Sequence, residues 1–164
     1  MVNDLVKIFY LYHEYPINEH TVSQKTIGFF TTKIEAESII KEYKIKPGFN
    51  EYKNNFIIKE LIVDNGLNCS NNFSDVKNYD RIYTLYEISN LNDSNEDYYI
   101  LLGCFSSKNK AEFFNDYYRS RFNTKASIHT EIFKERIGVL GWCDGFKAGE
   151  SGQQQSEDGS MIEP

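Results

Sequence analysis

The sequence predicts an α+β fold: two tandem β-β-α-β repeats that form one pseudo-symmetric domain, with an antiparallel or mixed sheet and the helices on one face. The first observation is a repeat, since residues 27–33 (IGFFTTK) reappear as residues 102–108 (LGCFSSK). The second is that Ala36-Glu37 recurs as Ala111-Glu112 at the same spacing. The third is that Leu11-Tyr12 corresponds to Leu85-Tyr86 in the apolar run before each copy. Two copies of one supersecondary unit usually pack about a pseudo-twofold axis or stack side by side.

Three strands are expected in the first repeat. Residues 6–15 are apolar and aromatic with little alternation, which is typical of a strand covered on both faces. Residues 21–31 predict a second strand, in which Gly28 indicates a bulge or a close approach of another backbone. Residues 56–63, FIIKELIV, predict the third strand.

A helix is expected between the second and third of these strands. Thr32 and Glu35 have the spacing of a capping box, in which each side chain accepts a hydrogen bond from the other residue's backbone amide. An apolar stripe follows at helical spacing, and Pro47-Gly48 is a stop signal. The stripe consists of Ala36, Ile39, Ile40 and Tyr43.

The second repeat predicts the same order of elements. Strands are expected at residues 81–89, 97–106 and 127–136, with a helix at 108–121. The predicted organisation is a first repeat at 1–63, an Asn-rich connector at 64–80, a second repeat at 81–146 and a disordered acidic tail at 147–164.

Charge and composition exclude several classes of function. The formal net charge is −6, of which the tail carries −3 because Lys147 faces four carboxylates there, and this leaves −3 for residues 1–146. No cluster of Lys and Arg is visible, so nucleic-acid binding is not expected. The absence of a signal peptide and of an 18-residue apolar run predicts no membrane association. The three widely spaced cysteines favour a reducing compartment, and the protein is expected to be cytoplasmic, as a monomer or weak homodimer.

No catalytic constellation is visible, and the chain is predicted not to be an enzyme. His13 and Glu14 are neighbours on a strand, so their side chains point to opposite faces. Asp144 would raise the pKa of the adjacent Cys143 and leave it unreactive, whereas Trp142 and Phe146 are expected to clamp the last segment onto the core. No phosphate-binding glycine motif and no metal-ligand spacing occurs, so no cofactor and no metal site is predicted.

A set of short motifs resembles a family of small bacterial domains of unknown activity. The motifs are residues 9–15 (FYLYHEY), 27–32 (IGFFTT), Glu35-Ala36-Glu37, Pro47-Gly48-Phe49 and Trp142-x-x-Gly145-Phe146. Most such domains are single units, whereas here the first copy lacks the terminal Trp-x-x-Gly-Phe and the second lacks Pro-Gly-Phe. In general character the chain is similar to immunity proteins that neutralise contact-dependent growth-inhibition toxins. This resemblance implies a binding partner and no chemistry of its own.

The functional hypothesis is a non-enzymatic immunity protein that occludes the active site of a cognate toxin, expected to be a nuclease. Its binding surface is predicted from an acidic hairpin loop and from aromatic side chains, since tyrosines are enriched at interfaces and acidic groups speed encounter with a basic partner. The alternatives are a phage counter-defence inhibitor and a small-molecule or nucleotide sensor that uses the groove between the repeats. The candidate partner-binding residues are Asp93, Glu96, Asp97, Tyr98, Glu14 and Tyr12.

Overall fold

A computed structural model describes residues 5–19, 21–65, 80–90, 97–122 and 128–143. Within these residues the chain forms six strands and two α-helices, together with one turn of 3₁₀ helix at Asn50–Tyr52. The elements follow in the order β1 (Lys7–Asn18), β2 (Thr21–Phe30), α1 (Lys33–Tyr43), β3 (Phe56–Ile62), β4 (Arg81–Asn90), β5 (Asp97–Phe105), α2 (Lys108–Arg121) and β6 (Ile128–Arg136). The predicted α+β class is confirmed.

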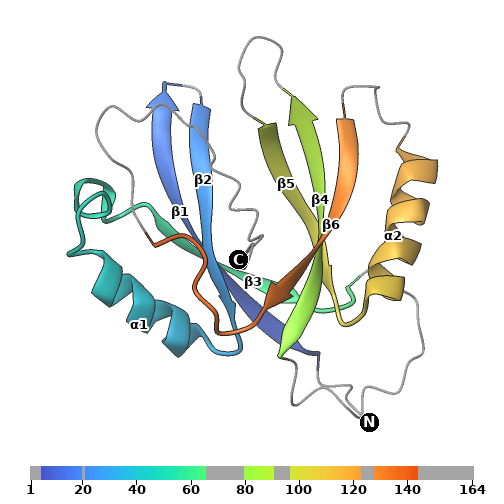
Figure 1. Ribbon diagram of the computed structural model, residues 1–164, viewed down its shortest axis with the longest axis horizontal. Coiled ribbons are helices and arrows are strands. Elements are labelled where there is room, and N and C mark those ends of the chain that lie inside the picture. The colour runs from blue at the N-terminus through green and yellow to red at the C-terminus, as the bar shows by residue number, and fades with distance from the viewer. Residues whose placement is uncertain (1–4, 20, 66–79, 91–96, 123–127, 144–164) are drawn as a thin grey trace, which may run out of the picture.

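The strands form two separate three-stranded sheets, ordered β2-β1-β3 and β5-β4-β6 (Figure 1). Every pairing within them is antiparallel. In each sheet the first strand of the unit is central, and the strand after the helix returns on its other side. The sequence left open whether the sheet was antiparallel or mixed; the structure has two antiparallel sheets.

The helices lie on the outer sides of the molecule (Figure 1). Helix α1 packs against β1, β2 and β3, and α2 packs against β4, β5 and β6. Each helix begins with a side-chain cap, as predicted for the first: Thr32 and Glu35 form a complete capping box, and Ser107 accepts from the backbone amide of Lys110 at 3.4 Å. We call β1 to β3 with α1 the first half and β4 to β6 with α2 the second half. The face of each sheet that its helix does not cover is turned toward the other half.

A bulge occurs at the same place in both hairpins. Leu11 lies opposite Gly28 and Tyr12 opposite Thr26, so the intervening Ile27 has no partner in the register. Leu85 and Tyr86 lie opposite Gly103 and Leu101 in the same way. A bulge bends its strand and increases the local twist. Both sheets therefore bend at equivalent positions.

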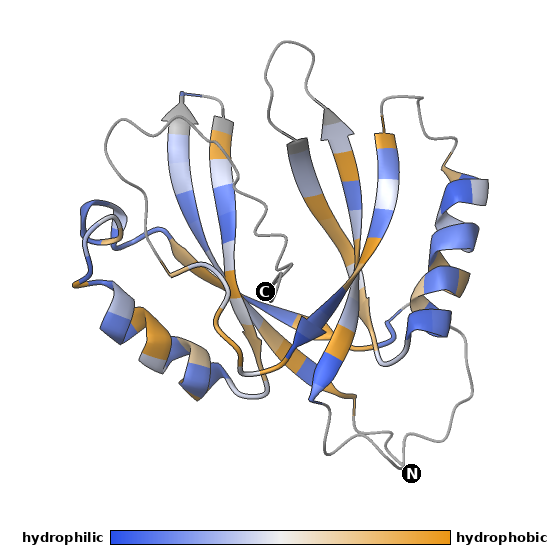
Figure 2. Ribbon diagram, in the orientation of Figure 1, coloured by the Kyte–Doolittle hydropathy of each residue, from blue (hydrophilic) through white to orange (hydrophobic). Residues whose placement is uncertain are grey.

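Three apolar clusters stabilise the fold, and Figure 2 shows the hydropathy of the elements that carry them. One lies under α1 around Leu11 and Tyr43, and another lies under α2 around Leu85 and Phe105. The third is shared, because it combines first-half and second-half residues. Its buried members are Ile8, Tyr10, Phe29, Val63, Ile82 and Cys104.

Asp64 joins the two halves at the end of the first sheet. Its backbone amide donates to the carbonyl of Cys104 at 2.9 Å. Its carboxylate accepts from the Ser106 amide at 2.9 Å and from the Ser106 hydroxyl and Lys110 Nζ at 2.7 Å each. The Asp64 side chain is only 4% exposed. This junction (Asp64, Ser106, Lys110) fixes the first sheet to the start of α2.

The segment 137–142, here called the strap, leaves β6 and runs back along β2 of the first half. The amides of Gly138 and Gly141 each donate at 2.8 Å, to the carbonyls of Phe29 and Ile27 respectively. A methyl group placed on Gly28 would lie 3.0 Å from the carbonyl oxygen of Val139. The close backbone approach predicted at Gly28 is therefore present, and its partner is the strap.

No helix within the described ranges has the length and apolar character that spanning a membrane requires.

Candidate ligand-binding pocket

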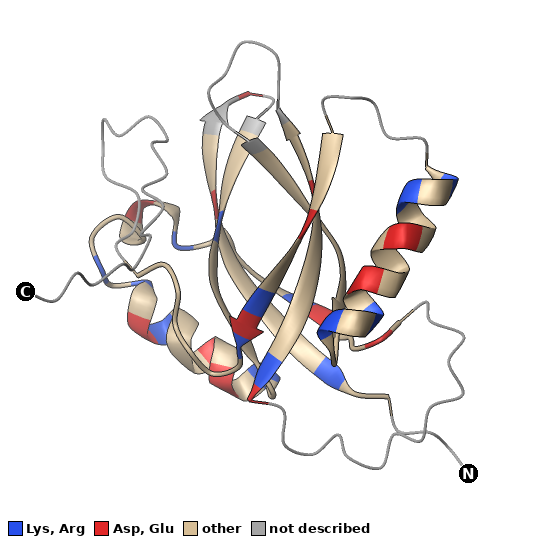
Figure 3. Cartoon of the chain, turned by 45° about the vertical axis from the view of Figure 1, so that its right-hand side comes forward, with Lys and Arg blue, Asp and Glu red and all other residues tan. Residues whose placement is uncertain are grey.

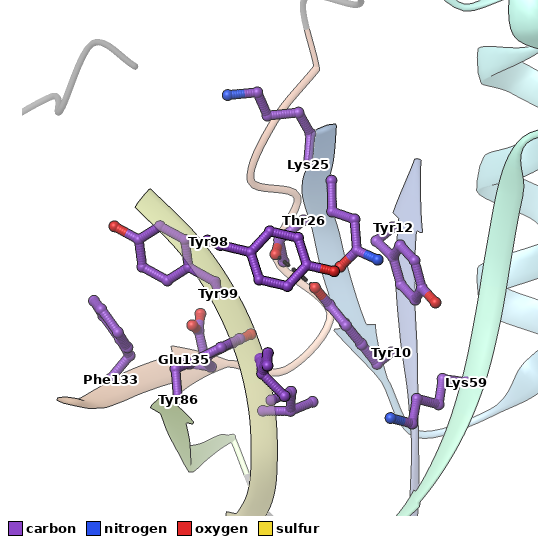
Figure 4. A pocket seen from close by; sticks show the side chains of 13 residues that line it. Tyr10, Tyr12, Lys25, Thr26, Lys59, Tyr86, Tyr98, Tyr99, Phe133 and Glu135 are labelled. Atoms are coloured by element: carbon purple, nitrogen blue, oxygen red, sulfur yellow. Dashed lines mark hydrogen bonds between the residues drawn. The ribbon is translucent and has the colours of Figure 1, made fainter. Parts of the chain in front are cut away.

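A pocket of about 380 Å³ lies between the two sheets and takes lining residues from both halves (Figure 4). Strands β1, β2 and β3 supply one wall, and β4, β5 and β6 supply the other. Six of the thirteen lining residues are aromatic. The lining consists of Tyr10, Tyr12, Gln24, Lys25, Thr26, Lys59, Tyr86, Tyr98, Tyr99, Ile100, Leu101, Phe133 and Glu135.

The first-half wall is built on a row of parallel rings. The ring of Tyr10 stacks on Tyr12 at 4.8 Å between centroids and on Phe29 at 4.8 Å, with interplanar angles of 29° and 13°. Its hydroxyl is held by a hydrogen bond of 2.9 Å to the hydroxyl of Thr26 on β2. These three contacts hold the ring of Tyr10 in one orientation on this wall.

The second-half wall presents rings at right angles to one another. Tyr86 on β4 meets Tyr99 at 6.2 Å and 80°, and Phe133 at 5.6 Å and 81°. Edge-to-face packing of this kind is favourable because the positive edge of one ring meets the negative face of another. Tyr98 belongs to the same wall, near the start of β5, and is 39% exposed.

Burial keeps the phenol groups at the base of the pocket neutral. It raises the pKa of Tyr10, and it raises that of Tyr86 strongly, with the neighbouring Tyr10 hydroxyl adding to the effect. Neutral phenols both donate and accept hydrogen bonds. The base of the pocket therefore offers hydrogen-bonding groups without charge.

Charged groups of opposite sign stand on the two walls. Glu135 on β6 is partly buried, and burial raises the pKa of its carboxyl group. Lys25 and Lys59 extend from β2 and β3 on the opposite wall (Figure 4). Across the described residues no salt bridge forms to any of these three groups. The pocket thus contains one carboxyl and two ammonium groups that do not neutralise one another.

Each helix carries both acidic and basic residues, as Figure 3 shows. Lys33 and Glu37 pair at 3.6 Å in α1, and Lys108 and Glu112 pair at 3.2 Å in α2. All four side chains are about half exposed, and such pairs contribute little to stability. These charges serve the helices and lie away from the pocket lining.

The structure brings two of the predicted partner-binding residues into one pocket. Tyr12 and Tyr98 both line it, from opposite halves. Glu14 lies beside it and accepts from Gln24, a lining residue, at 2.9 Å. Asp97 is the first residue of β5, whereas Asp93 and Glu96 fall outside the described residues.

Sequence reasoning missed the groups that give the pocket its chemistry. Lys59 and Glu135 lie in strands whose apolar neighbours dominated the pattern, and no motif marks either residue. Tyr86 did carry a signal, because it is the counterpart of Tyr12 in the second copy. Treating the repeated tyrosines as a pair would have found one residue on each wall.

Tyr10 and Tyr12 of the resembling motifs line the pocket, whereas aromatic residues from three of these motifs lie in one cluster under α1. His13, Phe49 and Trp142 come from three distant motifs, and their rings lie 5.0 to 6.3 Å apart. The clamping role predicted for Trp142 is confirmed, and its target is the first half; Phe146 is outside the described residues. These motif residues therefore build the core.

His13 is fully buried in that cluster. Its Nε2 donates to the carbonyl oxygen of Tyr52 at 2.9 Å, which assigns the proton to Nε2 because a carbonyl can only accept. Burial lowers the pKa of His13. The ring is a neutral structural group at neutral pH.

The cysteines that the structure describes are free thiols in contrasting surroundings. Cys143 is exposed. Cys104 is buried in the shared cluster, donates to the carbonyl of Ile62 at 3.7 Å, and has its pKa raised by burial to about 12. Its thiol is therefore held protonated.

No group of three or more His, Cys, Asp or Glu side chains is placed to hold a metal ion in the part of the chain that the structure describes. Comparisons with protein-family models, with curated proteins and with solved structures give no match. The pocket between the sheets is thus the feature on which a functional argument can rest.

Proposed function

We propose that this chain is a non-enzymatic binding protein that holds a small molecule in the pocket between its two sheets. The observation that carries the proposal is the pocket itself, which is walled by aromatic rings and holds charged groups that form no salt bridge with any residue the structure describes. Its volume lies at the lower end of the range of small-molecule sites, which is about 300 to 1,000 Å³. The neutral phenols of Tyr10 and Tyr86 suit recognition and are poor nucleophiles.

We infer further that the two halves are copies of one β-β-α-β unit and that the pocket lies where they meet. The same strand order, bulges at equivalent positions and a side-chain cap at the start of each helix support this inference. Equivalent positions have diverged within the pocket: Lys59 lies opposite Tyr10, whereas its counterpart Phe133 lies opposite Thr84. Divergence at lining positions is what a duplicated scaffold needs in order to recognise an asymmetric ligand. The free thiols favour a cytoplasmic setting.

A thermal-shift screen with nucleotides, amino acids and other metabolites tests the proposed function. A ligand that binds the folded protein alone raises the midpoint of unfolding in proportion to its occupancy. Tyr98→Ala should reduce the shift, whereas Tyr117→Ala should not. Tyr117 is the matched control because it is similarly exposed, at 49%, but lies on α2 away from the pocket. A shift that both variants retain in full would place the ligand elsewhere.

An immunity protein remains a second candidate, and it is favoured by the surface of β5. Tyr98 and Ile100 are 39% and 43% exposed on this edge strand, directly after the acidic loop. An exposed apolar edge strand is a common site of protein pairing. This candidate requires that the toxin domain encoded beside the gene bind the protein, with an affinity that weakens as salt rises and that falls in Tyr98→Ala. Binding that salt does not change would contradict the electrostatic part.

A further inference from the structure

We propose that the ligand of the pocket is a nucleotide, bound with its base between the aromatic walls, its amino edge at Glu135 and its phosphate at Lys59. This inference rests on the proposed function and specifies the ligand class. It combines the shape of the lining, the opposite charges on the two walls and the lack of salt bridges to those charges among the described residues.

The aromatic walls favour a flat ligand. Tyr10 and Tyr12 are stacked on one side, and the rings of Tyr86, Tyr99 and Phe133 lie on the other. Stacking on an aromatic side chain is favourable for every base, because each base presents a flat π-face. A flexible aliphatic ligand could not stack on these rings in this way.

Glu135 calls for a ligand with N–H donors. Its carboxyl group is partly buried on a wall of aromatic rings and has no salt bridge among the described residues. A carboxylate accepts hydrogen bonds from both N–H groups on the Watson–Crick edge of guanine, whereas adenine presents a single amino group there. The carboxyl group therefore favours guanine over adenine.

Lys59 calls for an anionic group at the end of the ligand away from Glu135. It reaches the pocket from β3 of the first half, whereas Glu135 comes from the second half (Figure 4). An ammonium group without an acidic partner in the described region suits a phosphate. A ligand of this polarity bridges the two halves, with its base at the second and its phosphate at the first.

Isothermal titration calorimetry with guanosine 5′-monophosphate, guanosine, adenosine 5′-monophosphate, inorganic phosphate and L-tryptophan tests this assignment. Guanosine monophosphate should bind most tightly. Replacing Lys59 with Met should weaken its binding roughly tenfold, as expected for loss of one hydrogen bond to a charged group, and should leave the binding of guanosine unchanged. Glu135→Gln should weaken guanosine and its monophosphate equally. Circular dichroism and the unfolding midpoint of each unliganded variant check that it folds.

The possible results separate this inference from the proposed function. Binding of L-tryptophan or another metabolite without any nucleotide would overturn the nucleotide assignment and leave the pocket as a small-molecule site. Nucleotide binding that survives in Glu135→Gln and in Lys59→Met would also overturn it, because the nucleotide would then bind elsewhere. If no compound binds and the screen gives no shift, both proposals fail together.

Discussion

At the scale of single residues, the main feature is that burial shifts the pKa values of ionisable groups away from their values in water. Glu135 and His13 illustrate the two directions. Burial raises the pKa of the Glu135 carboxyl and lowers that of the His13 imidazole, and in each case it favours the neutral form. The first group faces a pocket and the second faces the core under α1. Only the first is therefore placed to act on a ligand.

The raised pKa of Glu135 predicts a stability that depends on pH. The folded state binds this proton more tightly than the unfolded state does, so the stabilisation is complete below the unfolded pKa and is lost as pH rises through the folded pKa. Glu135→Gln has no carboxyl group to ionise, so the variant does not lose stability in this way as pH rises. We expect the variant to unfold at a higher temperature than the wild type near pH 8, with the difference vanishing near pH 4.

Glu131→Gln is the control for this measurement, because Glu131 lies exposed on the same strand. Differential scanning calorimetry across the pH range should give a flat difference between this variant and the wild type. An equally flat difference for Glu135→Gln would mean that the Glu135 carboxyl is not destabilised by its surroundings.

At the scale of elements, the two hairpins share a bulge and a glycine but differ in what lies against them. Gly28 and Gly103 occupy equivalent positions, and a methyl group on either would meet the ring of its own Phe30 or Phe105, at 3.1 or 3.0 Å. Only at Gly28 does a second obstacle occur, the carbonyl oxygen of Val139 at 3.0 Å. The pair therefore isolates the contribution of the strap.

Gly28→Ala is expected to destabilise the protein by about 1–3 kcal/mol, the usual cost of overpacking, and Gly103→Ala by less. The strap backbone cannot move aside as easily as a phenyl ring can rotate, because the strap amides donate hydrogen bonds to β2. Urea unfolding gives the free energies. Hydrogen exchange at the amides of Gly138 and Gly141 should accelerate in Gly28→Ala alone; equal costs and unchanged exchange would show that the strap does not restrain this position.

The elements were largely predictable from the sequence because local rules decide them. The capping box at Thr32, the apolar stripe of α1 and the order of strands in each repeat follow from spacing within short segments. The two-sheet arrangement was not predictable, because it depends on which faces meet. Likewise, Lys59 and Glu135 look like ordinary strand residues in the sequence. They line the same pocket only because the two halves pack against each other.

At the scale of the whole molecule, two connections hold the halves together around the pocket. The strap carries Trp142 from the second half into the aromatic cluster of the first. The junction at Asp64 holds the first sheet to the start of α2. Both connections lie outside the pocket lining, whereas the shared cluster includes Tyr10, which lines the pocket. Only part of the contact between the halves is therefore independent of a ligand.

Asp64 is the residue whose loss should separate the halves. It has a left-handed backbone with φ of 61°, which Asp and Asn tolerate better than Ala does. Asp64→Ala removes the acceptor of three hydrogen bonds and leaves the half-buried Lys110 ammonium without this partner. We expect it to cost about 3 kcal/mol, near the lower limit for breaking a buried pair. Asp64→Asn keeps the backbone preference and one acceptor oxygen, and it should cost less.

Labelling of Cys104 by a thiol reagent reports whether this loss opens the interface. Its thiol is buried between the halves, and its carbonyl accepts from the Asp64 amide. With Cys69 and Cys143 replaced by Ser, Cys104 is the remaining thiol of the three. Its labelling should be slow in the parent, faster in Asp64→Asn and fastest in Asp64→Ala. Labelling that stays slow in a destabilised Asp64→Ala would mean that the halves unfold as one unit, with the shared core, not the junction, controlling their separation.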